Sequence, residues 1–232
     1  MEVKQVEFTV VVPALNEEEY IGACLESIRG QSVDCELIVV DSGSSDDTRA
    51  IASGLADKVL DGRKNIPYNR QVGLESARSE IVVSTDADCR HSPNWLEDLT
   101  GHFRDKRVVA VSGPTVPDPS ESVMMDKACY LAGNLFLWAG HKFGLVWFRG
   151  SNSAYRRSIA IEAGGYDTSL RAREDSDLSQ RVSGYGVTVF DWRVKVMTSM
   201  RRRRNTGWFK TIKYYLDTPA SILRGKTYYE KA

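Results

Sequence analysis

The first half of the chain alternates two kinds of hydrophobic pattern. Short apolar runs, such as those at 8–12 and 36–40, are rich in β-branched residues and predict buried strands. Between them lie stretches in which apolar residues recur every three or four positions, the spacing of one helix face. This alternation is typical of a mainly parallel sheet with helices on both faces, so we predict an α/β fold.

Local signals place the individual elements. Asn16 and Glu19 form a capping-box pattern, so we expect the first helix to begin there and to end before Gly30. Ser92 and Pro93 predict the start of a later helix. Further strands are expected at 58–60, 80–88 and 108–111, and further helices near 51–55 and 70–77.

The pattern becomes less regular after Gly113. Three prolines precede an apolar, aromatic segment at 123–148. The simplest interpretation of that segment is a helix packed into the core, and the alternative is contact with a lipid or a membrane interface. We predict one domain at 1–200, with halves at 1–115 and 116–200, followed by a basic amphipathic segment at 201–232.

The 232-residue chain has no net charge, but its charges are unevenly distributed. Residues 193–232 hold eleven Lys and Arg against Asp217 and Glu230, a local net charge of +9, so the rest carries −9. A basic segment interleaved with aromatic residues suits an anionic surface or phosphate groups. A solvated charged face is the ordinary alternative.

The cysteines and the N-terminus indicate the compartment. The four cysteines show neither CxxC nor zinc-site spacing, and the N-terminus lacks the apolar core of a signal peptide. We expect a cytoplasmic location, extending to peripheral contact with the inner face of the cell membrane. The longest uncharged stretch, 128–140, is too short to span a bilayer.

The strongest candidate chemistry is the sequence Asp86-Ala87-Asp88, which ends an apolar run. If this sequence continues the strand, side chains two residues apart share a face, so the two carboxylates approach one divalent cation. The small Ala87 lets a ligand come close. The alternative is that the aspartates only form a turn after the strand.

Other polar clusters also follow predicted strands. They lie at 13–18 and 41–46, and Asp86 and Asp88 follow a third strand. Ligands of open α/β sheets bind outside the carboxyl ends of the strands, so we expect these clusters to line one crevice.

The ordered series of motifs resembles the family 2 glycosyltransferases, which have the GT-A fold. The resemblance covers roughly residues 7–200. The motifs that carry it are Val12-Pro13-Ala14-Leu15-Asn16-Glu17-Glu18, Val40-Asp41-Ser42-Gly43-Ser44-Ser45-Asp46, Arg70-Gln71-Val72-Gly73-Leu74, Asp86-Ala87-Asp88, Gly150-Ser151-Asn152-Ser153-Ala154-Tyr155-Arg156-Arg157, Gly164-Gly165-Tyr166-Asp167 and Glu174-Asp175-Ser176-Asp177-Leu178-Ser179-Gln180-Arg181.

The resemblance implies metal-dependent transfer of a sugar from a nucleotide sugar, most often UDP-linked, to an acceptor hydroxyl with inversion. Mg²⁺ or Mn²⁺ held by Asp86 and Asp88 would neutralise the leaving diphosphate. The first half would bind the nucleotide sugar through Pro13, Asn16, Glu17, Asp41, Ser42, Gly43, Arg70, Asp86 and Ala87. Helix capping by Asp41 or Asp46, and an ordinary surface ion pair for Arg70, are the structural alternatives.

By the same resemblance, the second half would hold the catalytic carboxylates and the acceptor. Asp175 is the predicted general base and Glu174 its neighbour in the catalytic pair. Crowding with Asp177 favours a raised carboxylate pKa, although acidic residues are also normal at a helix N-terminus. The predicted acceptor-binding residues are Trp147, Gly150, Ser151, Asn152, Arg201 and Arg202.

Two other functions remain as alternatives. A nucleotidyltransferase would use a similar sheet and metal-binding aspartates. It would also need a glycine-rich loop after the first strand to bind the triphosphate, and residues 13–17 contain no glycine. A non-catalytic scaffold would bind nucleotide sugar or lipid only. We expect a nucleotide sugar and a glycan or lipid-linked acceptor as partners and no nucleic acid, because no reading module is recognisable.

Overall fold

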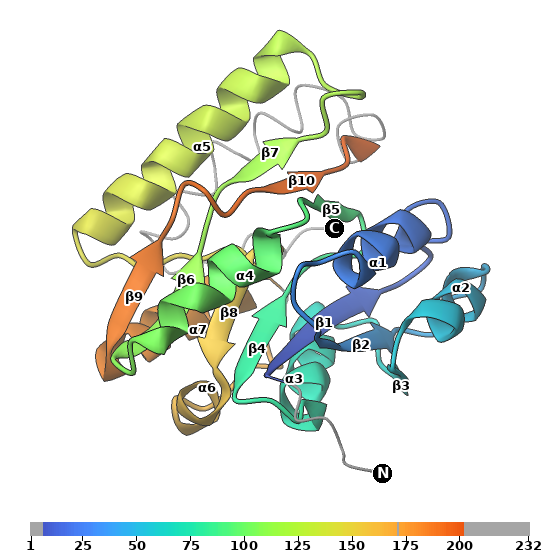
Figure 1. Cartoon of the computed structure of the whole chain (residues 1–232), viewed down its shortest axis with the longest axis horizontal. Helices are drawn as coiled ribbons and strands as arrows, with labels where there is room; N and C mark the ends of the chain where they lie inside the picture. Colours follow the sequence, from blue (N-terminus) through green and yellow to red (C-terminus); the bar gives the residue numbers. More distant parts are fainter. Residues whose placement is uncertain (1–6, 171, 202–232) are drawn as a thin grey trace.

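A computed structural model describes residues 7–170 and 172–201 of the chain. They form a seven-stranded sheet with the strand order β3-β2-β1-β4-β8-β6-β9 and a three-stranded sheet with the order β5-β10-β7 (Figure 1). The strands are β1 Phe8–Ala14, β2 Glu36–Asp41, β3 Lys58–Asp61, β4 Ile81–Ser84, β5 Cys89–His91, β6 Val108–Ser112, β7 Thr115–Pro117, β8 Ser153–Arg156, β9 Val187–Phe190 and β10 Val196–Thr198.

The central sheet is mostly parallel, as predicted. Strands β3, β2, β1 and β4 run parallel, β8 is antiparallel to both β4 and β6, and β9 is again parallel to β6. Strands from both predicted halves therefore share one sheet. Because β8 is antiparallel, its N-terminal end lies at the edge where β1, β2 and β4 have their carboxyl ends.

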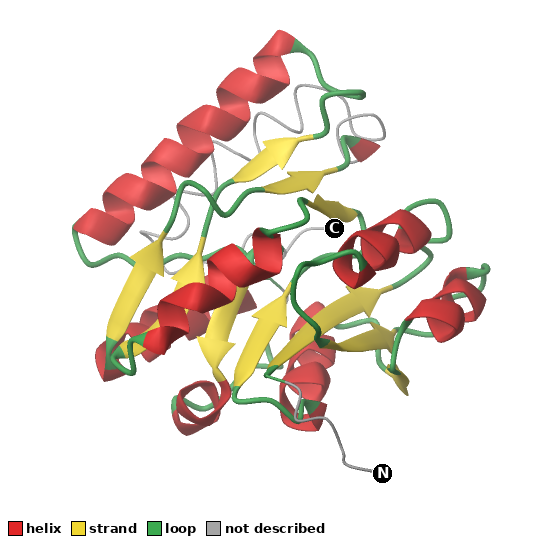
Figure 2. Ribbon diagram, viewed as in Figure 1, coloured by secondary structure: helices red, strands yellow, loops and turns green. Residues whose placement is uncertain are grey.

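Helices cover both faces of this sheet (Figure 2). Along β1, Val10 and Val12 pack on one face with α1 and α4, whereas Val11 packs on the other face with α3. This is the alternation expected of a strand buried on both sides. The helices are α1 Ile21–Arg29, α2 Thr48–Leu55, α3 Ile66–Ser76, α4 Trp95–Thr100, α5 Met124–Lys142, α6 Arg157–Glu162 and α7 Glu174–Val182, with short 3₁₀ turns at Gly101–Arg104 and Ser183–Tyr185.

The predicted capping box at Asn16 is wrong. Helix α1 begins at Ile21, and its N-cap Tyr20 makes no side-chain capping bond. Asn16 instead adopts a left-handed conformation with φ 54°, and its side-chain oxygen accepts a hydrogen bond from the Ser45 backbone N–H at 2.9 Å. A contact with a neighbouring loop replaces the local contact that the pattern predicts.

The core helix predicted at 123–148 is only partly correct. Trp147 and Phe148 are buried, but they lie after α5 has ended. Within α5 the buried residues are Asp126, Tyr130 and Asn134, and most of the apolar side chains are exposed. No helix among the described residues is both long and apolar enough to cross a membrane.

Gly73 lets α3 approach β1 closely, and this contact yields a prediction about stability. A Cβ atom at Gly73 would lie 2.1 Å from Cγ1 of the buried Val11. We expect Gly73→Ala to lower the free energy of unfolding by about 1–3 kcal/mol, because overpacking outweighs the better helix propensity of alanine. The measurement is urea unfolding followed by circular dichroism.

Gly54 on α2 provides the matched control, since a Cβ atom there meets nothing within 4 Å. Gly54→Ala should leave stability unchanged or raise it by up to about 1 kcal/mol. Equal stability changes in the two variants would contradict the packing argument.

Candidate active site

The loops after β1 and β2 are hydrogen-bonded to each other. The Asn16 N–H donates to Ser44 Oγ at 2.9 Å, and the Glu17 N–H donates to Thr48 Oγ1 at 2.7 Å. Asp46 accepts from the Glu18 N–H at 3.2 Å and also from the N–H and hydroxyl of Thr48, so it joins the loop after β1 to the first residue of α2. The interlocked loops form one wall at the carboxyl edge of the sheet.

The predicted nucleotide residues on β1 and β2 lie along this wall. Pro13 is half-buried near the end of β1 and pairs with Val40. The Asp41 carboxylate is buried and accepts a hydrogen bond from the Ser44 hydroxyl at 2.6 Å. Ser42 accepts from Asn69 Nδ2 at 2.6 Å. Gly43 is exposed, with φ 80°, a conformation that favours glycine.

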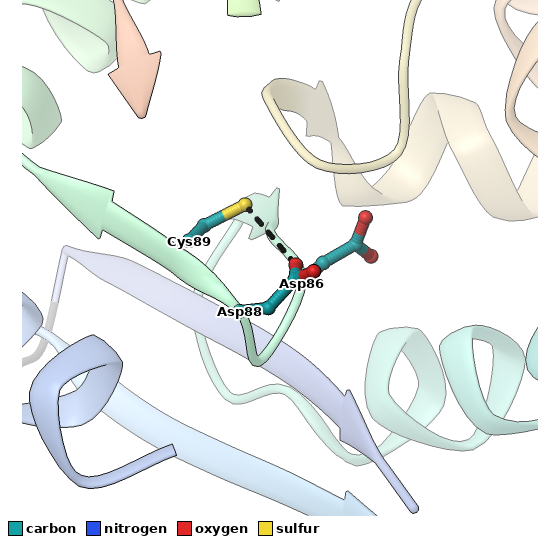
Figure 3. Close-up of side chains that lie close together, drawn as sticks. All are labelled: Asp86, Asp88 and Cys89. Atoms are coloured by element: carbon teal, nitrogen blue, oxygen red, sulfur yellow. Dashed lines mark hydrogen bonds between the residues drawn. The ribbon is translucent and has the colours of Figure 1, made fainter. Parts of the chain in front are cut away.

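Asp86 and Asp88 lie in a tight turn rather than on the strand itself. Strand β4 ends at Ser84, and the Cys89 N–H donates to the Asp86 carbonyl at 3.1 Å to close the turn. The strand-alternation argument is therefore wrong, but the turn achieves the same result. One ligand atom from each of Asp86, Asp88 and Cys89 lies within 4.8 Å of the others (Figure 3).

The donor set fits a hard divalent cation. Carboxylate oxygens are the ligands that Mg²⁺ and Mn²⁺ prefer. The Cys89 thiol lies 3.9 Å from Asp88 Oδ1, but burial raises its pKa well above the ordinary value, and a neutral thiol is a poor ligand. Asp86 and Asp88 are therefore the candidate metal ligands, with the buried Ala87 between them.

Arg70 joins the aspartate turn to the other side of the site. Its buried guanidinium forms ion pairs with Asp86 Oδ1 at 2.6 Å and with Glu174 Oε1 at 3.2 Å. It also donates to the Ser84 hydroxyl and to the Gly150 carbonyl, the latter at 2.9 Å. The surface ion-pair alternative for Arg70 is wrong, because the side chain is only 4% exposed.

Glu174 and Asp175 occupy the first turn of α7, directly beyond Arg70. Burial, followed by repulsion from Asp175, raises the pKa of Glu174 from its ordinary 4.5 to about 7. Asp175 Oδ2 accepts a hydrogen bond from the Gly150 N–H at 2.6 Å, and its Oδ1 accepts from the Ser176 N–H at 2.7 Å. Asp177 points to Arg181, with which it forms an ion pair at 2.5 Å.

The predicted acceptor residues at 147–152 divide into two groups. Gly150 contacts both Arg70 and Asp175, and the Ser151 carbonyl accepts from Thr85 Oγ1 at 3.0 Å, so these two residues line the site. Asn152 is buried, accepts from Trp95 Nε1 and donates to two backbone carbonyls, so it holds the loop in place. Trp147 is buried and stacks on Phe136.

Arg201, predicted on the acceptor side, contacts Glu17, a residue predicted to bind the nucleotide. Its Nη2 lies 2.6 Å from Glu17 Oε1, and its guanidinium lies over the Tyr20 ring. Burial raises the pKa of Glu17, and the Arg201 ion pair opposes this effect. Glu17 Oε2 is buried without a hydrogen-bond partner in the described part of the chain. Arg202 and the rest of the predicted basic segment lie outside the described residues.

Two contributors to the site were not predicted. The Ser199 hydroxyl donates to Asp88 Oδ2 at 3.0 Å, and the Ser199 N–H donates to the Asp88 carbonyl at 3.1 Å. Ser84 binds Arg70 from the end of β4. Serine is too common for its position alone to indicate such roles, and Ser199 follows Asp88 by more than a hundred positions.

Comparison with known proteins agrees with this architecture. The sequence profile of glycosyl transferase family 2 matches residues 9–180. The chain is 30% identical over 203 residues to the succinoglycan biosynthesis protein ExoA of Rhizobium meliloti, covering 78% of this chain and 60% of ExoA. It is 25% identical over 197 residues to the glucosyl-dolichyl phosphate glucuronosyltransferase of Haloferax volcanii, covering 79% of this chain and 63% of that enzyme.

A solved structure shows the same fold. The mannosyltransferase PcManGT from Pyrobaculum calidifontis, in complex with GDP-Man and Mn²⁺, superposes with a TM-score of 0.65 at 24% sequence identity. The match covers 84% of this chain and 57% of PcManGT. The chain thus spans about 60% of the length of the curated relatives described above.

The raised pKa of Glu174 generates a prediction about stability and pH. A carboxyl group with a pKa near 7 in the folded state stabilises the fold most below its unfolded pKa of 4.5, and this contribution is lost as the pH rises through 7. The stability advantage of the native protein over Glu174→Gln should therefore shrink between pH 5 and pH 8. Urea unfolding at both pH values measures it.

Exposed Glu162 on α6 is the control for this experiment. Glu162→Gln should keep the pH dependence of the native protein. The same stability difference between native protein and Glu174→Gln at both pH values would contradict the prediction.

Proposed function

Because this chain belongs to glycosyl transferase family 2, we propose that it transfers a sugar from a nucleotide diphosphate sugar to an acceptor hydroxyl. The observation that carries the proposal is the position of Arg70 between two acidic pairs. It contacts Asp86 at 2.6 Å on the donor side and Glu174 at 3.2 Å on the acceptor side. The proposed donor-binding and base residues therefore lie on either side of the Arg70 guanidinium. This brings them close together, as a single displacement reaction requires.

On the donor side, the loops after β1 and β2 bind the nucleoside. Asp41, at the end of β2, accepts hydrogen bonds from the base, and Pro13, Asn16 and Glu17 shape the pocket together with Ser42, Gly43 and Ala87. We propose a UDP-linked sugar as the donor. A thermal-shift screen of UDP-, GDP- and dTDP-sugars with Mn²⁺ tests the base, because a tightly bound ligand raises the melting temperature.

The metal belongs at Asp86 and Asp88. These two carboxylates would hold Mg²⁺ or Mn²⁺. The bound cation would neutralise the negative charge that develops on the departing diphosphate. Arg70 orients Asp86 by a hydrogen bond to Oδ1, and Ser199 orients Asp88 by a hydrogen bond to Oδ2. The protein therefore fixes the carboxylates before the donor arrives.

On the acceptor side, Asp175 is the base in an inverting displacement. Two backbone N–H groups, from Gly150 and Ser176, hydrogen-bond its carboxylate and fix its direction. Held in this direction, the carboxylate takes the proton from the acceptor hydroxyl as that oxygen attacks the anomeric carbon and the nucleoside diphosphate leaves. Glu174 is paired with Arg70 and buried, so it positions Arg70 rather than taking that proton.

The acceptor that we propose is a lipid-linked or cell-envelope glycan. This rests on the relatives, one of which is named for succinoglycan biosynthesis and another for a dolichyl phosphate substrate. Such an acceptor places the protein at the cytoplasmic face of a membrane, in peripheral contact with it. Arg201 lies beside Glu17, and we propose that it meets the phosphate groups of the donor or acceptor, because arginine binds phosphate oxygens in a bidentate manner.

The base assignment predicts a specific kinetic signature. Asp175→Asn should lower the transfer rate by roughly 10²–10⁴-fold and leave nucleotide affinity nearly unchanged, because the amide keeps the size but cannot take a proton. Initial rates and calorimetric titration with UDP and Mn²⁺ measure the two effects. Asp177→Asn, on the same helical turn but paired with Arg181, is the matched control and should remain active.

If Asp175→Asn kept near-normal turnover, Asp175 would be only a helix-start carboxylate. If the native protein neither hydrolysed nor transferred any nucleotide sugar, it would be a binding scaffold and the proposed reaction would be rejected.

The metal assignment predicts a different signature for Asp88. Excess chelator should abolish transfer, and added Mn²⁺ or Mg²⁺ should restore it, because carboxylates facing a diphosphate repel it without a cation. Asp88→Asn should weaken both Mn²⁺-dependent UDP binding and the rate. Full activity in chelator, or normal nucleotide affinity in Asp88→Asn, would contradict the metal role.

A further inference from the structure

Helix α5 has its polar and apolar sides reversed relative to an ordinary helix of a soluble protein. Its buried positions, Asp126, Tyr130 and Asn134, recur every four residues and are all polar or amphipathic. Asn134 donates to the Thr115 carbonyl at 2.8 Å and accepts from Arg149 at 2.8 Å. At the neighbouring Gly133, a Cβ atom would lie 3.0 Å from Arg149 Nη2, so the absence of a side chain there allows Arg149 to pack closely against α5.

The opposite side of α5 is apolar and exposed. Its residues recur at helical spacing, so they form one stripe along the helix, which we call the outer face of α5. Four large side chains in the stripe are between 36% and 79% exposed. The outer face consists of Met124, Ala128, Leu131, Leu135 and Trp138.

Within the described chain the outer face is accessible except in part at Trp138, whose ring contacts Trp192 with 6.4 Å between the ring centroids. The helix runs along the periphery of the molecule, beside β7 and away from the helices that cover the central sheet (Figure 2). Directly after it, Phe143 is 85% exposed. A continuous apolar stripe of this kind marks a surface that binds another apolar surface.

We propose that the outer face of α5 docks onto an anionic lipid bilayer. The residue types are those of a helix that lies in a membrane interface, with Leu, Met and Trp on one side. The charges on the exposed side are Lys127 and Lys142, one near each end, and the one acidic residue of α5, Asp126, is buried. Lys142 lies 6.0 Å from the Trp138 ring, which combines a cation with an interfacial aromatic residue.

This docking surface rests on the proposed function and gives it a partner. Arg149 contacts Asn134 on the inner side of α5, and the next residue, Gly150, donates its N–H to Asp175. One short loop thus connects the lipid-facing helix to the candidate base. A lipid-linked acceptor held in the bilayer would meet the catalytic crevice without leaving the membrane surface.

The test is flotation of the full chain with vesicles. The probes are phosphatidylcholine vesicles and vesicles that also contain phosphatidylglycerol. We expect binding to the anionic vesicles. We expect at least about a tenfold loss of binding in Leu131→Glu/Leu135→Glu, because two apolar side chains that would enter the bilayer become charged. Lys127→Gln/Lys142→Gln should reduce the preference for anionic vesicles.

The matched control places the same charges on exposed isoleucines elsewhere. Ile66 on α3 and Ile161 on α6 are 54% and 42% exposed, and Ile66→Glu/Ile161→Glu has the same net charge as the α5 double variant. It should bind vesicles like the native protein. The circular dichroism spectrum should be unchanged in both double variants, which shows that they are folded.

The other outcomes separate a failure of the docking surface from a failure of the proposed reaction. Undiminished vesicle binding in the α5 double variant, or equal loss in the control, would overturn it. A concentration-dependent dimer that the α5 double variant abolishes, without vesicle binding by the native protein, would identify a second copy as the occupant instead. If α5-dependent vesicle binding occurred without sugar transfer from any nucleotide sugar, the docking surface would stand and the proposed reaction would fail.

Discussion

The buried guanidinium of Arg70 is the interaction on which the rest of the site depends. A cation removed from water is costly unless opposite charges and hydrogen bonds compensate it, and Asp86 and Glu174 supply both on opposite sides. Its close packing also requires Gly150, where a Cβ atom would lie 2.5 Å from Arg70 Cζ. The aspartate turn, the 147–152 loop and the start of α7 are therefore held together by one side chain.

The sheet brings these segments to the same edge. Because β1, β2 and β4 are parallel, their following loops are neighbours, and the antiparallel β8 adds the loop that precedes it. Hydrogen bonds from Asn16 and Glu17 to the loop after β2 then fix these two loops against each other. The acidic groups are thus fixed before any ligand binds, which reduces the reorganisation that binding and reaction require.

The arrangement separates two kinds of carboxylate. Asp86 and Asp88 are in a turn with partial exposure, where hard cations can reach their oxygens. Glu174 is buried against Arg70 and has a raised pKa, whereas Asp175 accepts hydrogen bonds from the backbone N–H groups of Gly150 and Ser176. Neighbouring carboxylates in one site can therefore have different tasks, because burial and hydrogen bonding differ at each.

The sequence by itself determined the features that depend on local periodicity. Alternating apolar runs predicted the parallel sheet with helices on both faces, and the ordered motifs predicted the family, both of which are confirmed. The polar clusters at strand ends also indicated one crevice, since the carboxyl ends of parallel strands share an edge.

Only the tertiary structure decided the features that depend on distant contacts. Asn16 does not form the predicted capping box, because its side-chain oxygen accepts a hydrogen bond from Ser45 in the loop after β2 instead. The Glu17–Arg201 ion pair joins residues 184 positions apart, a separation at which a local pattern carries no information. The reversal of α5 was likewise invisible, because periodicity shows that one side is apolar, whereas the polar partners at Thr115 and Arg149 decide which side faces inward.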